Sequence, residues 1–307
     1  MHVAVVIVSY RNPLDVVACL KALSGSRHHD FEVVVCENGG QIAYEALVAA
    51  IPARLSNLQP VVAICAPSNL GYGGGVNLGM RETAHADAWW VLNPDTEPSA
   101  TALSLMLDRL ASNDCDAVGG TIFYPDGLVQ SQGGRWRRMM ARAVSLGNGL
   151  SRAQAEEHAP CVEPRLNYLS GASMLITRRF FELTGEMRED YFLYCEEVEW
   201  CLRGRERGAK FGFSQAAEVL HHQGTTTGNP ADVRRQARMP VYLNERNRLL
   251  LTRDLYPQLV PTAAVLAFLL ILLRFARRGA WSQVGYALQG WRAGLANERG
   301  VPDWMKS

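Results

Sequence analysis

A single carboxylate stands directly after a pattern typical of a buried strand. The apolar run 88–92, Ala-Trp-Trp-Val-Leu, stops at the turn Asn93-Pro94-Asp95. Pro94 cannot donate to a sheet ladder, so the run predicts a strand that ends here and presents Asp95 on a turn. Ligands of open α/β sheets bind at the carboxyl ends of the strands. At that position the carboxylate could hold a divalent metal, and the metal could bind a phosphate. The alternative is that Asp95 caps a helix that begins near Ser99.

Three more carboxylates crowd the start of a predicted helix. Glu196, Glu197 and Glu199 lie within the segment 191–203, between large apolar residues that favour partial burial. A carboxylate held in such surroundings can act as a general base. The alternative is a set of helix-end charges on a solvated face, where the helix dipole favours negative charge.

His221 ends another strand-like run, at 217–222. Imidazole and carboxylate groups both bind divalent metals. A lone histidine is more often structural, but beside Asp95 it is a candidate metal ligand.

Two polar turns follow other predicted strands. The first contains Ser9, Tyr10 and Asn12, and the second contains Glu37 and Asn38 before two glycines. The first turn could contact a nucleotide through its backbone. The second could do so through the carboxylate of Glu37. An ordinary Asn- and Gly-rich turn is the alternative for the second.

A glycine-rich segment runs from Asn69 through Gly71 and Gly75 to Asn77. We expect a helix to begin at Gly75, so that glycines allow a close backbone approach and the helix N-terminus forms an anion site. The segment is not a dinucleotide fingerprint, because Val76 stands where the third glycine should be, and it lacks the Gly-Lys-Ser/Thr of a P-loop.

The elements that must position these residues alternate between strand and helix patterns. Predicted strands cover 3–10, 31–36, 61–66, 89–92 and 117–124, and predicted helices cover 14–23, 42–50, 75–84 and 100–112. Such alternation predicts an α/β fold with a mostly parallel sheet and helices on both faces.

The pattern changes after residue 128. Residues 130–163 are predicted to form loops with a short helix, 168–176 a strand and 196–207 a helix, and the chain is helical from 232 on. We therefore expect a domain over 1–225, with a regularly alternating half at 1–125 and a less regular half at 126–225. A helical C-terminal region follows at 226–307.

The segment Ala263–Leu273 has no polar side chain and is followed by Arg274, Arg277 and Arg278. It is shorter than the roughly 20 apolar residues that a membrane span requires. An apolar segment beside a basic cluster predicts a helix lying on an anionic membrane face. The alternative is a buried helix that packs on the domain.

The composition limits the class of protein. The formal net charge is +1, which gives no bulk attraction to nucleic acid. The seven cysteines are scattered without a Cys-x-x-Cys pair, as in a reduced, cytoplasmic protein. The N-terminal apolar stretch lacks a basic region before it and is expected to be the first strand, not a signal peptide.

Taken together, these motifs resemble the family 2 glycosyltransferases with the GT-A fold, and in particular their bacterial rhamnosyltransferase-like branch. The order and spacing of the motifs carry the resemblance, which runs from Val3 to about Arg253. The matching motifs are Val-Ser-Tyr-Arg-Asn at 8–12, Glu-Asn-Gly at 37–39, the glycine segment 69–77, Leu-Asn-Pro-Asp at 92–95, Ser-Gly-Ala at 170–172, the acidic stretch 191–203, His221 to Gly228, and Glu-Arg-Asn-Arg at 245–248.

The resemblance implies that 1–125 is the nucleotide-sugar-binding half of a GT-A catalytic domain and 126–225 its acceptor-side, catalytic half, and it implies a role for each motif. Asp95 would hold a Mg²⁺ or Mn²⁺ that bridges the donor diphosphate, with His221 near it. The Glu196–Glu197 pair would supply the catalytic base, with Glu197 favoured and Glu196 as the alternative. The implied nucleotide-sugar-binding residues are Ser9, Tyr10, Asn12, Glu37, Asn38, Asn69, Gly71, Gly75, Asn77 and Asn93.

The chain departs from the family pattern in two ways. The family usually has Asp where this chain has Glu37, Glu197 and Glu199, so the geometry of the base must adjust to a longer side chain. Asn93 replaces the first Asp of the family's Asp-x-Asp motif, which leaves Asp95 as its only anionic ligand.

The implied function is inverting, metal-dependent transfer of a sugar to a hydroxyl of a cell-surface glycan or its lipid-linked precursor. The expected donor is dTDP-L-rhamnose, with UDP- and GDP-sugars as alternatives. We expect polysaccharide biosynthesis at the inner face of the cytoplasmic membrane, by a peripheral enzyme that can form a homodimer. The rival interpretations are an inactive sugar-nucleotide-binding module and a nucleotide-dependent oxidoreductase.

Overall fold

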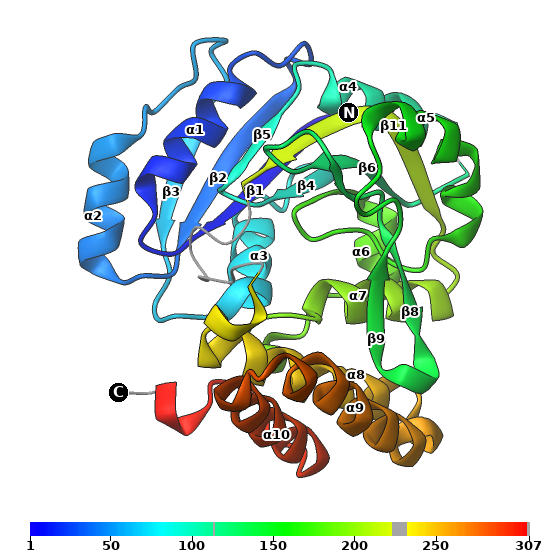
Figure 1. Cartoon of the computed structure of the whole chain (residues 1–307). Helices are drawn as coiled ribbons and strands as arrows, with labels where there is room; N and C mark the ends of the chain where they lie inside the picture. Colours follow the sequence, from blue (N-terminus) through cyan, green and yellow to red (C-terminus); the bar gives the residue numbers. More distant parts are fainter. Residues whose placement is uncertain (113, 223–231, 306–307) are drawn as a thin grey trace.

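The computed structural model describes residues 1–112, 114–222 and 232–305. A central sheet with helices on both faces forms one part of the molecule, and three C-terminal helices lie beneath it (Figure 1). The strands are β1 (Val3–Ser9), β2 (Phe31–Glu37), β3 (Val61–Cys65), β4 (Ala88–Leu92), β5 (Thr96–Pro98), β6 (Ala117–Phe123), β7 (Val129–Ser131), β8 (Gly134–Arg137), β9 (Arg142–Ser145), β10 (Ser173–Thr177) and β11 (Phe211–His221). The helices are α1 (Pro13–Leu23), α2 (Gln41–Ala50), α3 (Gly71–Glu82), α4 (Ala102–Leu110), α5 (Arg152–His158), α6 (Arg178–Thr184), α7 (Glu196–Glu206), α8 (Arg238–Leu255), α9 (Val260–Arg274) and α10 (Trp281–Leu295).

The main sheet has the strand order β3-β2-β1-β4-β10-β6-β11-β5, with β7 paired to β6. Strands β3, β2, β1 and β4 are parallel neighbours, and β6 is parallel to β11. Strands β10 and β5 join the sheet antiparallel. The predicted α/β fold with a mostly parallel sheet and flanking helices is confirmed.

Both faces of the sheet are buried, which explains the continuous apolar runs of its strands. Ala4 and Val6 of β1 pack toward α3, α6 and α7, whereas Val3 and Val5 pack toward α1, α2 and α4. The carboxyl ends of β1, β2 and β4 therefore meet at one edge of the sheet, between the two helix layers.

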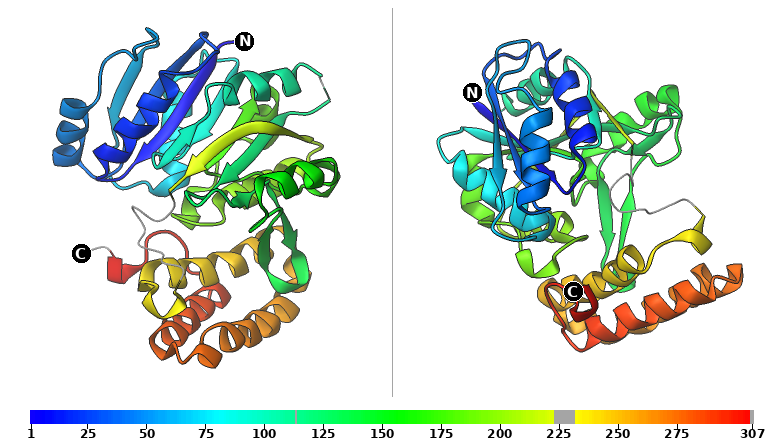
Figure 2. Two further views of the ribbon diagram at one scale, coloured as in Figure 1. Left: turned by 45° about the horizontal axis from the view of Figure 1, so that its top comes forward. Right: turned by 90° about the vertical axis from the view of Figure 1, so that its left-hand side faces the viewer.

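The second half of the chain holds the main differences from the predicted elements. The strand predicted at 168–176 begins only at Ser173, and the strand predicted at 217–222 starts earlier, at Phe211. Within the predicted loop region, β8 and β9 form a separate hairpin that reaches toward α9, as Figure 2 shows. Its tip is a single 3₁₀ turn, η1 (Arg138–Met140), which packs on α9.

The C-terminal region is helical, as predicted. The proposed boundary at 225/226 and residues 223–228 of the motif that begins at His221 lie outside the described residues. The apolar segment is part of a longer helical stretch than expected: within the part of the chain that the structure describes, one helix, Pro257–Arg278, is long and apolar enough to span a membrane by length and composition alone. It has 22 residues; its apolar 18-residue window has a mean hydropathy of 2.3, and 28% of that window is buried, so one face packs on the protein. A core helix can pass the same test.

Glycines let α10 pack closely on α8. A Cβ at Gly290 would overlap the carbonyl oxygen of Tyr242, and one at Gly294 would meet that of Arg246. By contrast, a Cβ at Gly285 on the same helix would meet no atom within 4 Å. Close packing of α10 thus fixes the position of α8, which contacts the candidate site described below.

Gly290→Ala should destabilise the protein by about 1–3 kcal/mol, because the added methyl group forces the two helices apart. The matched control Gly285→Ala should stabilise it by about 0.5–1 kcal/mol, because alanine loses less backbone entropy in a helix. Urea unfolding of both variants measures the difference. Equal effects would show that the α8–α10 contact does not require glycine.

Candidate active site

A cavity of about 450 Å³ opens at the carboxyl edge of the sheet. Residues from the sheet, from α7 and from the C-terminal region, including Met239 and Met305, line it together. Of the residues predicted from the sequence, it brings together Tyr10, Asn38, Asn69, Gly71, Asn93, Asp95, Glu196, Glu197 and His221.

Asp95 and His221 meet because β5 pairs antiparallel with β11, in a register that places His221 opposite Thr96. His221 Nε2 lies 3.1 Å from Asp95 Oδ1, and both side chains are largely buried. A strand, not a helix, follows Asp95, and α4 begins only at Ala102 after the N-cap Thr101. The helix-cap alternative for Asp95 is therefore wrong.

The hydrogen bonds of His221 suit a cation beside Asp95. His221 Nδ1 lies 2.8 Å from Gln130 Oε1, which can only accept, so the ring proton belongs on Nδ1. Nε2 then directs a lone pair toward Asp95 Oδ1, and the amide nitrogen of Asn93 lies 3.4 Å from the same Nε2. Two acceptor atoms so close together fit a shared divalent ion, with Gln130 holding the imidazole in the required tautomer.

A strained turn delivers the carboxylate pair to the cavity. Phe192, Tyr194 and Cys195 have φ values of +68°, +75° and +73°, a region that side chains other than glycine rarely adopt. Such strain persists only where the surroundings over-determine it, and it tends to occur at functional sites. The turn ends at Cys195, the N-cap of α7, so Glu196 and Glu197 occupy the first turn of that helix.

Two fully buried side chains of α8 hold this turn. Asn247 Nδ2 donates to the carbonyl oxygens of Tyr191, Leu193 and Tyr194, at 3.0, 2.8 and 2.8 Å. Arg246 donates to the Tyr191 carbonyl oxygen at 2.9 Å and, through Nε, to Asn247 Oδ1 at 2.9 Å. The resemblance included these residues without giving them a role, and the structure shows what they support.

The two glutamates have different environments. Glu196 is 1% exposed, and neither carboxylate oxygen has a hydrogen-bond partner among the described residues. Burial first, and the charge of Glu197 second, raise the pKa of Glu196 well above the usual range. Burial also raises the pKa of Glu197, but the backbone N–H groups of Glu197 and Val198 oppose the rise. The pair therefore favours a protonated Glu196 beside an ionised Glu197.

The third carboxylate of the cluster is structural. Glu199 is buried and accepts two hydrogen bonds from Arg203, at 2.7 and 2.9 Å. It does not line the cavity.

The structure corrects the role expected of Glu37. Its side chain is fully buried and accepts hydrogen bonds from Ser9 Oγ at 2.6 Å, from the Arg11 N–H at 3.0 Å and from the Gly39 N–H at 2.7 Å. Asn12 Oδ1 in turn accepts a hydrogen bond from the Tyr10 N–H at 3.1 Å and lies 3.0 Å from Ser9 Oγ. Ser9, Asn12 and Glu37 thus lie outside the cavity lining, where they join the first two turns and position Tyr10 and Asn38.

The glycine segment also differs from expectation. Helix α3 begins at Gly71, not at Gly75. The Gly71 N–H already donates to Asn69 Oδ1 at 3.1 Å, and the Tyr72 N–H to the Phe192 carbonyl at 2.9 Å, so these groups are not available to an anion. Gly71 has φ +72°, and a Cβ there would overlap the Phe192 carbonyl. The glycine instead allows the strained turn to approach α3.

Gly75 and Asn77 lie outside the cavity lining for related reasons. A Cβ at Gly75 would press on Val8 of β1. Asn77 is buried and exchanges hydrogen bonds with the Met187 backbone, donating to its carbonyl at 2.9 Å and accepting from its N–H at 2.9 Å. These two residues pack α3 between the sheet and the segment that leads to the strained turn.

Several cavity residues were not anticipated from the sequence. Tyr72, Gln130, Tyr168 and Ser145 line the cavity, and Tyr72 Oη donates to the Gly171 carbonyl at 2.5 Å. The available sequence signal for the hairpin that carries Ser145 was the alternation of uncharged residues with arginines in Gly-Arg-Trp-Arg, along β8, but it spans only four residues.

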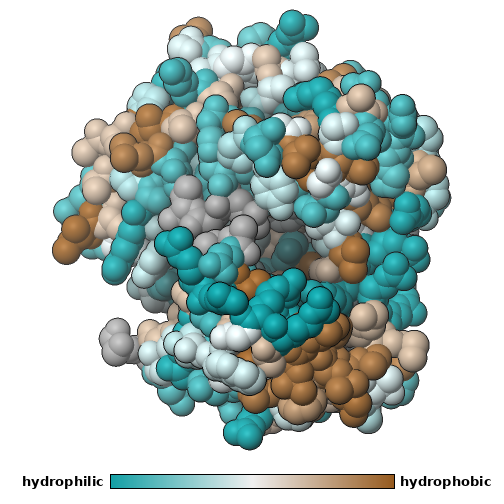
Figure 3. Space-filling view, in the orientation of Figure 1, coloured by the Kyte–Doolittle hydropathy of each residue, from teal (hydrophilic) through white to brown (hydrophobic). Residues whose placement is uncertain are grey.

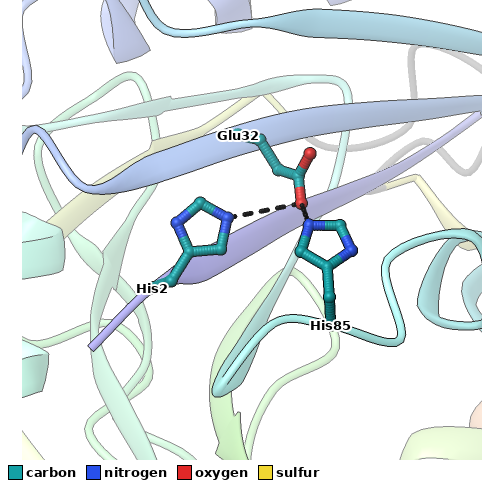
Figure 4. Close-up of side chains that lie close together, drawn as sticks. All are labelled: His2, Glu32 and His85. Carbon is teal, nitrogen blue, oxygen red and sulfur yellow. Dashed lines mark hydrogen bonds and ion pairs between the residues drawn. The ribbon is translucent and has the colours of Figure 1, made fainter.

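A second cluster of titratable side chains lies at the amino ends of β1 and β2, at the opposite end of these strands from the cavity. His2, Glu32 and His85 meet there, with Glu32 Oε1 3.4 Å from His2 Nε2 and 2.7 Å from His85 Nε2 (Figure 4). Partial burial lowers the pKa of His2, but hydrogen bonds and charge from Asp30 and Glu32 outweigh it and raise the pKa. This cluster is separate from the candidate active site.

Comparison with known proteins agrees with this fold. The Asp95–His221 pair and the Glu196–Glu197 pair line one cavity on an α/β sheet, as the resemblance to GT-A glycosyltransferases leads us to expect. The chain belongs to glycosyl transferase family 2, because the model of that family matches residues 4–182. It is therefore a glycosyltransferase, and the oxidoreductase interpretation is wrong.

Two curated relatives are similar over most of the chain. The low-salt glycan biosynthesis hexosyltransferase Agl10 of Haloferax volcanii is 24% identical over 98% of this chain and 94% of its own length. The N-acetylglucosaminyl-diphospho-decaprenol L-rhamnosyltransferase of Mycobacterium tuberculosis is 27% identical over 73% of this chain and 77% of its own.

Two solved structures share the fold. The mannosyltransferase PcManGT of Pyrobaculum calidifontis, in complex with GDP-Man and Mn²⁺, superposes with a TM-score of 0.58 at 13% identity, over 97% of this chain and 88% of that one. S. aureus TarS 1-349 superposes with a TM-score of 0.54 at 12% identity, over 96% of this chain and 81% of that one.

Asn247→Ala should lower kcat with little change in donor affinity, because the strained turn would relax and displace the carboxylate pair. Loss of three hydrogen bonds should also cost about 2–3 kcal/mol of stability. Steady-state kinetics with a binding assay for the donor separates the two effects. Asn244→Ala is the matched control on the same helix, where the amide donates only to the Pro240 carbonyl. If both variants keep wild-type kcat, Asn247 does not position the base.

Proposed function

We propose that this enzyme transfers a sugar with inversion, from a nucleoside diphosphate donor to a hydroxyl of a lipid-linked glycan precursor. The observation that carries the proposal is that two pairs of side chains, Asp95 with His221 and Glu196 with Glu197, line a single cavity. The first pair suits a diphosphate with its cation, and the second suits the attacking hydroxyl.

Glu197 is the base in this mechanism. Its carboxylate takes the proton of the acceptor hydroxyl, while the acceptor oxygen forms a bond to the anomeric carbon of the donor. The bond from that carbon to the diphosphate breaks on the opposite face, and the electron pair leaves with the diphosphate.

Glu196 keeps its proton through this step. Its burial and the neighbouring charge disfavour a second carboxylate, so a single negative charge remains on the pair. The first-turn N–H groups of α7 stabilise that charge on Glu197.

Asp95 and His221 would hold Mg²⁺ or Mn²⁺, with Asn93 beside them. When bound, such an ion supplies Lewis-acid stabilisation of the charge on the departing diphosphate. The mannosyltransferase that shares this fold is a complex with GDP-Man and Mn²⁺, which supports this choice of cofactor. Gln130 orients the imidazole, and Tyr10 and Asn38, held by the buried Glu37 network, face the donor.

dTDP-L-rhamnose is the donor that we propose, and UDP- and GDP-hexoses are the alternatives for a screen. The similarity to a rhamnosyltransferase whose name gives a lipid diphosphate acceptor supports both substrates and the rhamnosyltransferase-like branch. We further propose that the enzyme lies at the inner face of the cytoplasmic membrane. The support is the outer face of α9, where Val265, Leu269 and Leu273 are each more than half exposed.

Glu197→Gln should lower turnover by about 10²- to 10⁴-fold and leave donor affinity intact, because an amide cannot accept the proton. Glu196→Gln is the matched control, since glutamine resembles a protonated glutamate and should retain most activity. In a pH profile of kcat/KM, activity should fall on the acid side as Glu197 becomes protonated, because the active base is the ionised form. The pKa of this limb should lie above the usual glutamate pKa of about 4.3, because burial raises the pKa of Glu197. The reverse ranking of the two variants would make Glu196 the base.

Asp95→Asn should weaken metal-dependent binding of the nucleoside diphosphate at least tenfold, because the only carboxylate of the ligand pair is lost. Calorimetry with and without Mn²⁺ gives the metal-dependent part of the affinity. Glu97→Gln is the control, since Glu97 lies two residues away, outside the cavity, and pairs with His222. Equal metal dependence in Asp95→Asn and wild type would rule out this ligand.

A further inference from the structure

A second cavity, of about 710 Å³, lies between the β8–β9 hairpin and the C-terminal helices. Five arginines line it, and we call them the arginine basin: Arg142 of β9, Arg248 of α8, Arg274 of α9, and Arg277 and Arg278 after it. Among the described residues, the only carboxylate paired with any of them is Glu245, whose Oε1 lies 2.7 Å from Arg248 Nη1. The basin therefore carries a large excess of positive charge.

Desolvation and mutual repulsion oppose the charged form of two of these arginines. Desolvation, followed by the charge of Arg248, lowers the pKa of Arg274 to about 10. Desolvation and Arg248 also lower the pKa of Arg142. Grouping guanidinium groups where they repel one another is typical of a site that binds a multiply charged anion, and guanidinium forks match phosphate oxygens in pairs.

The basin is continuous with an apolar surface. Leu270 and Leu273 of α9 line the basin itself. Leu273 also belongs to the exposed face of α9, which comprises Val265, Leu269, Leu272 and Leu273, at helical spacing. Figure 3 shows apolar side chains gathered over the C-terminal helices, with hydrophilic side chains directly beside them. A ligand with an anionic head and a hydrocarbon chain fits this pair of surfaces.

Two elements connect the basin to the active-site cavity. Strand β9 has Arg142 in the basin at one end and Ser145 in the cavity at the other, about 10 Å along a strand. Helix α8 has Arg248 in the basin and Met239 in the cavity, about 13 Å along a helix. A sugar attached to its diphosphate can bridge this short separation.

We propose that the arginine basin binds the diphosphate of a polyisoprenyl diphosphate-linked acceptor, with the hydrocarbon chain along α9 and the acceptor sugar in the cavity beside Glu197. This inference rests on the proposed function and names the site that recognises its acceptor. A diphosphate, not a single lipid phosphate, matches a site built from five guanidinium groups.

Vesicle flotation of the full chain without donor tests the proposal. Neutral phosphatidylcholine vesicles are compared with vesicles that carry either a polyisoprenyl diphosphate or phosphatidylglycerol, at equal charge. Wild type should bind the diphosphate vesicles best, and inorganic pyrophosphate should compete. Arg142→Gln/Arg277→Gln should bind them about 30-fold more weakly, at roughly one kcal/mol for each arginine near an anionic surface.

The matched control is Arg27→Gln/Arg292→Gln, which removes the same charge from exposed arginines outside the basin and should bind like wild type. The basin variant should keep wild-type nucleotide affinity, which shows that it is folded. The proposal is overturned if the basin variant binds the diphosphate vesicles as wild type does. Equal binding of wild type to both charged vesicles also overturns it and indicates a general anionic surface.

The donor reaction is measured separately on the same proteins. If wild type releases nucleoside diphosphate but the basin variant still binds the lipid diphosphate, only the inference about the basin fails. If no sugar nucleotide is turned over by wild type although the basin binds as expected, the proposed function fails instead.

Discussion

The hydrogen bonds from Asn247 and Arg246 to the turn before α7 are the constraint on which the site depends. Three side-chain-bearing residues of that turn, Phe192, Tyr194 and Cys195, have left-handed backbone conformations, which an unsupported loop would not keep. The buried amide of Asn247 binds three carbonyl oxygens of the segment at once. The C-terminal region therefore supports the candidate site, because α8 holds the turn and the glycines of α10 allow close packing on α8.

The contact between Asp95 and His221 depends on strand register. His221 reaches Asp95 only because β11 pairs with β5 in the observed register, and a shift by one residue would turn the imidazole to the other face of the sheet. Strands thus position the Asp95–His221 pair, and helix α7 positions the carboxylate pair. The burial that raises the pKa values of Glu196 and Glu197 comes from the packing of the same elements.

The sequence predicts the parts of this structure that local patterns encode. Continuous apolar runs predict the strands of the parallel half, and the position of Asp95 after such a run predicts its place at the carboxyl edge. The burial of Glu37 could not be predicted in this way, because it depends on hydrogen bonds from Ser9, Arg11 and Gly39. The start of α3 at Gly71 was missed for a similar reason: only the approach of the Phe192 carbonyl shows why a glycine is needed at the first position of that helix. The arginine basin combines residues far apart in the chain, from Arg142 to Arg278, so the spacing of its C-terminal arginines reveals only part of it.

The central claim is that one cavity holds both the leaving diphosphate and the base that activates the acceptor. Release of nucleoside diphosphate from a panel of sugar nucleotides, with a polyisoprenyl diphosphate-linked sugar as acceptor, tests it most directly. The account predicts release from one donor, dependent on Mg²⁺ or Mn²⁺ and on the acceptor, and a product with inverted anomeric configuration. Donor binding without release under any of these conditions, or retention of configuration, would contradict it.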